Sequence, residues 1–144
     1  MTDQLNIALM FGAALSAVAA LLHVGIIFGG GPWYRFFGAG ERMAQACEAG
    51  RVYPAIVTAM IAATLAVWSA YALSGAGAIT ALPLLKLALM TITAVYLLRG
   101  FAIFPMLLWA RTKVTPFLLW SSLICIGYGA VHLVGLRQAW PALP

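Results

Sequence analysis

Four long apolar stretches, separated by short segments rich in glycine, proline and charged residues, organise this chain. A helix needs about 20 apolar residues to cross the hydrocarbon core of a bilayer, and each stretch is long enough. The predicted spans cover about residues 5–30, 54–74, 82–104 and 116–136. A glycine run followed by Pro32 is expected to end the first span, and Pro54 and Pro116 to open the second and fourth. The pattern predicts an all-α membrane protein, a single domain built as a four-transmembrane-helix up-and-down bundle.

The longest connection lies between the first and second spans and contains its own periodic pattern. Between Gly40 and Gly50, the apolar residues Met43, Ala46 and Cys47 recur at spacings of three and four. This spacing places them on one face of a helix. We therefore expect a short interfacial helix in the first loop, lying along the membrane surface.

Composition agrees with membrane insertion and excludes other classes. The 144 residues are 65% hydrophobic and 8% charged, whereas soluble domains carry about 25% charged residues. A soluble globular protein, a disordered chain and a secreted disulfide scaffold are excluded together. Eight basic against three acidic residues give a net charge of +5, but the bases stand singly within apolar sequence. No nucleic acid partner is therefore expected.

The distribution of Lys and Arg near the span ends predicts orientation, because loops that carry more of them stay in the cytoplasm. Five lie on one side and two on the other. The first and third loops hold Arg35, Arg42, Arg51, Arg111 and Lys113, whereas Lys86 and Arg137 lie at the opposite ends. This predicts a multi-pass protein of a bacterial-type inner (plasma) membrane with both termini outside the cytoplasm. The start of the chain has no basic segment, so we expect the first span to be retained.

Ionisable residues within the spans are the first candidates for function, because they are costly in lipid. Arg99 is expected in the cytoplasmic half of the third span, with Tyr96 one turn earlier, and His23 at a similar depth in the first span. Together with Glu41, they would form a cytoplasm-facing site for a phosphate or carboxylate group. The structural alternative is that Arg99 snorkels to lipid or pairs with Glu41, while His23 bonds a nearby carbonyl.

A secondary polar site is predicted at Tyr128 and His132, which are one turn apart in the fourth span. Interhelical hydrogen bonding is its structural alternative. Depth counting places His132 about 7 Å from Arg137 at the outer end and His23 near the inner end, so one haem cannot bridge the two histidines. The two cysteines are far apart in the sequence and form no redox pair or metal set. No cofactor and no metal are predicted.

Small residues follow one face of the first span. Gly25 and Gly29 form a GxxxG pair, and Gly12, Ser16 and Ala20 continue at four-residue spacing. Such stripes permit close approach between helices in membranes. The partner is either another helix of this chain or a second copy in a homo-oligomer.

Two family resemblances follow from short motifs. The first motif set consists of Leu22-His23, Gly29-Gly30, Pro54, Leu97-Leu98-Arg99-Gly100 and Thr115-Pro116. With these, most of the chain resembles a family of small bacterial four-helix inner-membrane proteins of unknown function, which implies the fold and no activity. Glu41-Arg42 before an Ala-rich span resembles the membrane-associated eicosanoid and glutathione metabolism family. There the motif continues with an arginine and an asparagine, whereas Gln45 and Glu48 stand here, so the glutathione-binding set is incomplete.

Three functional hypotheses result, in this order. The first is binding of a membrane lipid or an amphipathic anionic small molecule at Arg99, with His23 and Tyr96 as hydrogen-bonding partners and Glu41 as counter-ion. The second is an accessory or assembly subunit of a larger membrane complex. The third is a membrane-associated glutathione-type transferase. Only the third involves catalysis, so enzymatic activity is not the favoured expectation.

Overall fold

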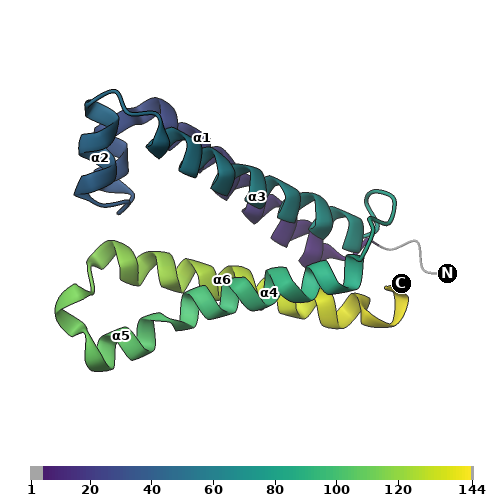
Figure 1. Ribbon diagram of the computed structural model, residues 1–144. Helices are drawn as coiled ribbons and strands as arrows, with labels where there is room; N and C mark the ends of the chain where they lie inside the picture. The colour runs from purple at the N-terminus through teal and green to yellow at the C-terminus, as the bar shows by residue number, and fades with distance from the viewer. Residues whose placement is uncertain (1–4, 144) are drawn as a thin grey trace. The chain divides into compact units, whose positions relative to one another are not determined.

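The computed structural model describes residues 5–143, which are helical with no strand (Figure 1). Four segments are long and apolar enough to cross a membrane: Ile7–Phe36, Tyr53–Gly75, Leu85–Trp109 and Pro116–Ala142. The predictions of an all-α chain and of four long apolar helices are therefore confirmed. The elements are α1 (Ile7–Phe36), α2 (Glu41–Glu48), α3 (Tyr53–Gly75), α4 (Leu85–Phe101), α5 (Ile103–Trp109), η1 (Arg111–Lys113), α6 (Pro116–Ala139) and η2 (Trp140–Ala142).

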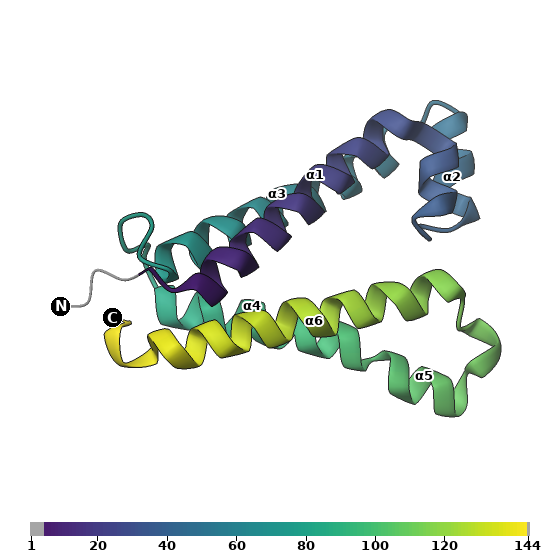
Figure 2. The same ribbon diagram turned by 180° about the vertical axis from the view of Figure 1, so that it is seen from behind.

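The chain divides into two compact units. The first unit comprises the chain up to Ser16 together with the chain from Trp68 onward, and the second comprises Ala17–Val67. Helices α1 and α3 run side by side and each passes from one unit into the other (Figures 1 and 2). In the first unit the Ser69 hydroxyl on α3 donates to the carbonyl of Ala13 on α1 at 2.8 Å.

Helix α1 continues to Phe36, six residues beyond the predicted end of the first span, and it is kinked on the way. Gly30 has a φ of 65° and a ψ of −154°, a conformation open to glycine because it has no β-carbon. Pro32 follows at the start of the second helical segment, where a missing N–H costs little. The glycine run therefore redirects the helix instead of ending it.

The part of α1 after the kink packs against the predicted GxxxG pair through Trp33. A β-carbon placed at Gly25 would lie 3.3 Å from Trp33 Cζ3, and one placed at Gly29 would overlap the Trp33 indole. In the second unit, Tyr34 is fully buried among Ile26 and Ala44, and its hydroxyl is hydrogen-bonded to Thr58 of α3 at 3.2 Å. Trp33 of the same helix thus occupies the space beside Gly25 and Gly29.

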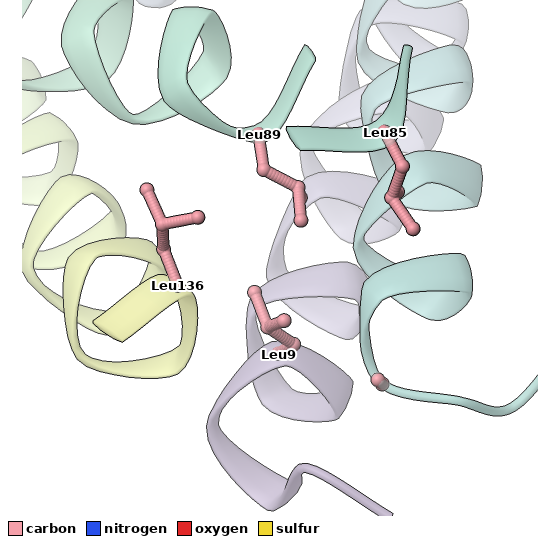
Figure 3. Close-up of a cluster of buried hydrophobic side chains, with 5 residues drawn as sticks. Leu9, Leu85, Leu89 and Leu136 are labelled. Carbon is pink, nitrogen blue, oxygen red and sulfur yellow. The ribbon is translucent and has the colours of Figure 1, made fainter. Parts of the chain in front are cut away.

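The first unit is packed around four leucines that point toward one another from α1, α4 and α6 (Figure 3). They are Leu9, Leu85, Leu89 and Leu136. Asn6 ties the start of α1 to the end of α6, because its Nδ2 donates to the carbonyl of Gly135 at 2.9 Å. Its Oδ1 accepts from the N–H of Leu9 at 3.0 Å and so caps the helix.

Glycine permits the closest helix contacts in this unit. A β-carbon at Gly135 would lie 2.6 Å from Leu9 Cγ and 2.9 Å from Leu9 N. At Gly100 of α4, it would lie 2.8 Å from the backbone nitrogen of Ile126 on α6. Helices α4 and α6 therefore run side by side at short range (Figures 1 and 2). Such close backbone approach is the usual role of small residues between membrane helices.

Replacing Gly135 by alanine is expected to destabilise the first unit, because the added methyl group meets the backbone of Leu9. We expect a loss of about 1–3 kcal/mol in the free energy of unfolding. Gly127→Ala is the matched control on the same helix, since nothing lies within 4 Å of a β-carbon there. Unfolding in mixed detergent micelles, followed by circular dichroism, measures both. Equal stability of the two variants would contradict a tight contact between α1 and α6.

Candidate functional site

A buried polar and aromatic cluster lies around Tyr96, where α1, α3, α4 and α6 of the first unit meet. The Tyr96 hydroxyl is hydrogen-bonded to Ser16 at 2.9 Å. Its ring centroid lies 5.0 Å from that of Trp68, 5.4 Å from Tyr128 and 5.2 Å from His132. We call these five residues the Tyr96 cluster. It joins Tyr96, predicted for the inner site, to both residues of the predicted secondary site.

His132 is fully buried within this cluster and uses one of its two ring nitrogens. Nδ1 lies 2.8 Å from the carbonyl oxygen of Tyr128, one turn earlier on α6. Because a carbonyl only accepts, Nδ1 carries the proton in the neutral ring, and Nε2 is left as an acceptor. Nε2 has no hydrogen-bond partner within residues 5–143. A β-carbon at Gly12 would lie 2.9 Å from His132 Cε1, so only glycine on α1 leaves room for the ring.

Sequence counting put Tyr96 toward the inner half of its span and His132 toward the outer end. Their rings nevertheless lie 5.2 Å apart. Counting residues along ideal helices ignores helix tilt and the reach of large side chains. Ser16 belongs to the predicted small-residue stripe, and its contact with Tyr96 means that this part of the stripe meets helices of the same chain.

Arg99 lies in the last turn of α4, one turn after Tyr96, and its recorded partners are neutral. Its two terminal nitrogens donate to Ser122 Oγ at 3.2 Å and to Ser121 Oγ at 3.3 Å, both on α6. Gly100 makes these contacts possible, because a β-carbon there would lie 3.0 Å from the carbonyl oxygen of Ser122. Arg99 itself is exposed on the surface of the helices.

Both glutamates of the chain bind one arginine, which we call the Arg35 clamp. Arg35 Nε and Nη2 donate to the two carboxylate oxygens of Glu41 at 2.9 and 2.8 Å, and Nη1 donates to Glu48 at 2.5 Å. The carboxylates belong to α2, and Arg35 to the segment of α1 after the kink. Hydrogen bonding to Arg35 lowers the pKa of both Glu41 and Glu48. A β-carbon at Gly31 would overlap the Glu48 side chain, so glycine leaves room for it.

His23 is half-buried, and its Nδ1 lies 2.7 Å from the carbonyl oxygen of Ala19 in the preceding turn. This is the local partner that the structural alternative predicts. His23 and Glu41 belong to the second unit, whereas Tyr96 and Arg99 belong to the first. A meeting of these two pairs stays a prediction, as does the role of His23 as a ligand-binding residue.

Several residues of these arrangements were not singled out from the sequence. Arg35 contributed only to the predicted orientation, although it stands six residues before Glu41. Ser121 and Ser122 form the only adjacent pair of hydroxyl residues in the fourth span, and this pair was the available signal for a partner of Arg99. Trp68 lies within an apolar stretch, and nothing in the sequence marks it as a contact of Tyr96.

Within residues 5–143, no group of three or more His, Cys, Asp or Glu side chains is arranged to hold a metal ion. The chain matches no protein-family model, no curated protein and no solved structure. Its function is therefore inferred from its own residues and contacts.

The lowered pKa values of Glu41 and Glu48 predict a pH response of the Arg35 clamp. As the pH falls, the ion pairs persist through 4.5, the ordinary carboxyl value, and are lost below it. Their contribution to stability is fully present above 4.5 and disappears as the pH passes through the lowered values. Carbon-13 NMR of the two glutamate carboxyls measures both titrations. Arg35→Gln is expected to return both to ordinary values, whereas Arg51→Gln, the control, is not. Ordinary pKa values in the unaltered protein would contradict the clamp.

Proposed function

We propose that this chain is a multi-pass membrane protein that binds an anionic amphiphile through Arg99. The ligand is a lipid or another amphipathic molecule with a phosphate or carboxylate group. One observation carries the proposal: Arg99 lies within an apolar segment long enough to span a membrane, and its recorded partners are two uncharged hydroxyls. A cation in that position calls for an anion, because an uncompensated charge is costly in lipid.

The chain has few carboxylates that could serve as the anion for Arg99. It contains three acidic residues, of which Glu41 and Glu48 are bound to Arg35 and Asp3 lies outside the described residues. Arg99 has no ion pair within residues 5–143. An external phosphate or carboxylate would provide the missing negative charge, and the planar fork of a guanidinium group matches either of them.

The geometry around Arg99 suits a ligand that arrives from the lipid. The side chain is exposed, so an acyl chain can lie along the apolar helix surface while its headgroup reaches the guanidinium group. Contacts of 3.2 and 3.3 Å to Ser122 and Ser121 are long for hydrogen bonds of a charged donor, which favours exchange for a stronger acceptor. In this proposal Arg99 provides the charge, and the serines hold it in place between ligands.

The proposal includes the arrangement in the membrane. The four apolar segments would form an up-and-down bundle with α2 at the interface, the first and third loops in the cytoplasm of a bacterial-type inner membrane and both termini outside. The excess of Lys and Arg in those two loops supports this orientation.

Native mass spectrometry of the protein released from its own membranes tests ligand binding. We expect a stoichiometric added mass on the unaltered chain that is lost in Arg99→Leu and retained in Arg137→Leu, which removes an exposed arginine elsewhere. Loss in both variants, or no added mass on the unaltered chain, would overturn the proposal. Added masses of other proteins in place of a small molecule would favour the accessory-subunit hypothesis.

Cysteine labelling tests the orientation. A cysteine introduced at Ala78, in the loop between α3 and α4, is expected to react with a membrane-impermeant maleimide in right-side-out vesicles. A cysteine at Thr112, in the loop between α5 and α6, is expected to react only after the membrane is opened. Both positions are exposed, so accessibility within the protein does not limit the reaction. The reverse pattern would refute the predicted orientation.

A further inference from the structure

A hollow of about 300 Å³ opens where α2 leads into α3, within the second unit. Its lining residues are Arg42, Gln45, Ala46, Ala49, Arg51 and Tyr53. This volume is at the lower end of the range for small-molecule sites and suits a compact group.

The sequence of α2 builds one wall of the hollow. Arg42, Ala46 and Ala49 are four and then three residues apart, so they follow one face of the helix. The two alanines leave the space open because they carry single methyl groups. Glu41 and Glu48 lie on a neighbouring face, about 100° around the helix from Arg42 and Ala49, where both carboxylates bind Arg35. Gln45, which also lines the hollow, donates to Glu41 Oε1 at 3.1 Å.

The turn after α2 places the second arginine. Gly50 has a φ of 71°, which favours glycine, and its N–H donates to the carbonyl of Cys47 at 3.0 Å. The N–H of Arg51 donates to the carbonyl of Ala46 at 2.9 Å. These two bonds form a Schellman motif, which ends the helix and turns the chain back beside it. Arg51 is thereby held at the same hollow as Arg42, and the Tyr53 hydroxyl donates to the carbonyl of Arg42 at 3.4 Å.

Neither arginine has an acidic partner within residues 5–143. The C-terminal end of a helix favours a nearby cation, which is enough to explain Arg51. Arg42 is the second residue of α2, where the helix dipole disfavours a positive charge. Helix stability therefore does not explain Arg42, whereas an anion bound at the hollow does.

We propose that this hollow binds a phosphate group through Arg42 and Arg51. Two guanidinium forks suit the several oxygens of a phosphate. The phosphate belongs to a lipid headgroup or is free inorganic phosphate, and both share this chemistry. The site does not use Arg99, so it stands independently of the function proposed above.

Calorimetric titration of inorganic phosphate into the full-length protein tests the site, in micelles of a neutral glycosidic detergent that contains no phosphate. We expect Arg42→Gln and Arg51→Gln each to weaken binding about tenfold and the double variant to abolish it. Arg111→Gln, which removes an exposed arginine from the other basic loop, and Arg99→Leu are expected to leave phosphate affinity unchanged. Circular dichroism verifies that the variants keep their helix content.

Short-chain phosphatidylglycerol, added as a competitor, distinguishes the two sources. Competition that depends on Arg42 and Arg51 assigns the site to a lipid headgroup, and phosphate binding without competition assigns it to free phosphate. Absence of phosphate binding, unchanged affinity in the double variant or equal weakening by Arg111→Gln would overturn the proposal. None of these results would alter the mass lost in Arg99→Leu, so the two proposals fail separately.

Discussion

The Arg35 clamp determines where positive charge remains on this protein. The chain has eight basic and three acidic residues, and one base takes both glutamates. The clamp depends on the backbone of α1, because Gly30 kinks the helix before Arg35 and Gly31 leaves room for the Glu48 side chain. The backbone of α1 thus affects which arginines keep an unpaired positive charge. Arg42, Arg51 and Arg99 have no carboxylate partner among the described residues.

Close contact between helices positions the polar side chains of the first unit, Arg99 among them. Association of helices in lipid relies on packing and hydrogen bonds, because burial away from water contributes little there. Gly100 brings Ser122 within reach of Arg99, and Gly12 leaves room for His132 beside Tyr96. The same glycines that hold the first unit together therefore also determine which side chains meet inside it.

Hydropathy was sufficient to predict the four long apolar helices, because their length and composition leave no other element of that size. The start of the fourth helix was also readable, since Thr115 caps it by accepting from the N–H of Leu118 and Pro116 occupies its first position. The course of α1 was not. A glycine run followed by proline fits both a stop and a kink, and the two are distinguished by the backbone of Gly30 and the packing of Trp33 beside Gly29.

The candidate sites were predicted less well than the helices. Arg99 and Tyr96 stand out as ionisable or polar groups in apolar sequence. For the partners of Arg99 the only signal is the adjacent pair of serines, and Trp68 beside Tyr96 carries no signal in an apolar stretch. The sequence does not single out Arg35 as a partner of Glu41, although the two lie six residues apart and are bound to each other. The meeting of Glu41 with Arg99 stays a prediction.

The rule that basic residues collect in cytoplasmic loops, from which the orientation is predicted, concerns how many arginines a loop has and not how they are arranged. Orientation depends on the number of Lys and Arg, and acids contribute little to it. Glu41 and Glu48 could therefore have faced any of the loop arginines without changing the orientation. They bind Arg35 instead, and a Schellman turn places Arg51 at the hollow that Arg42 also lines. Two like charges held at one hollow repel each other. Arg42 and Arg51 nevertheless line the same hollow, while both nearby carboxylates are bound to Arg35. A bound anion explains this arrangement.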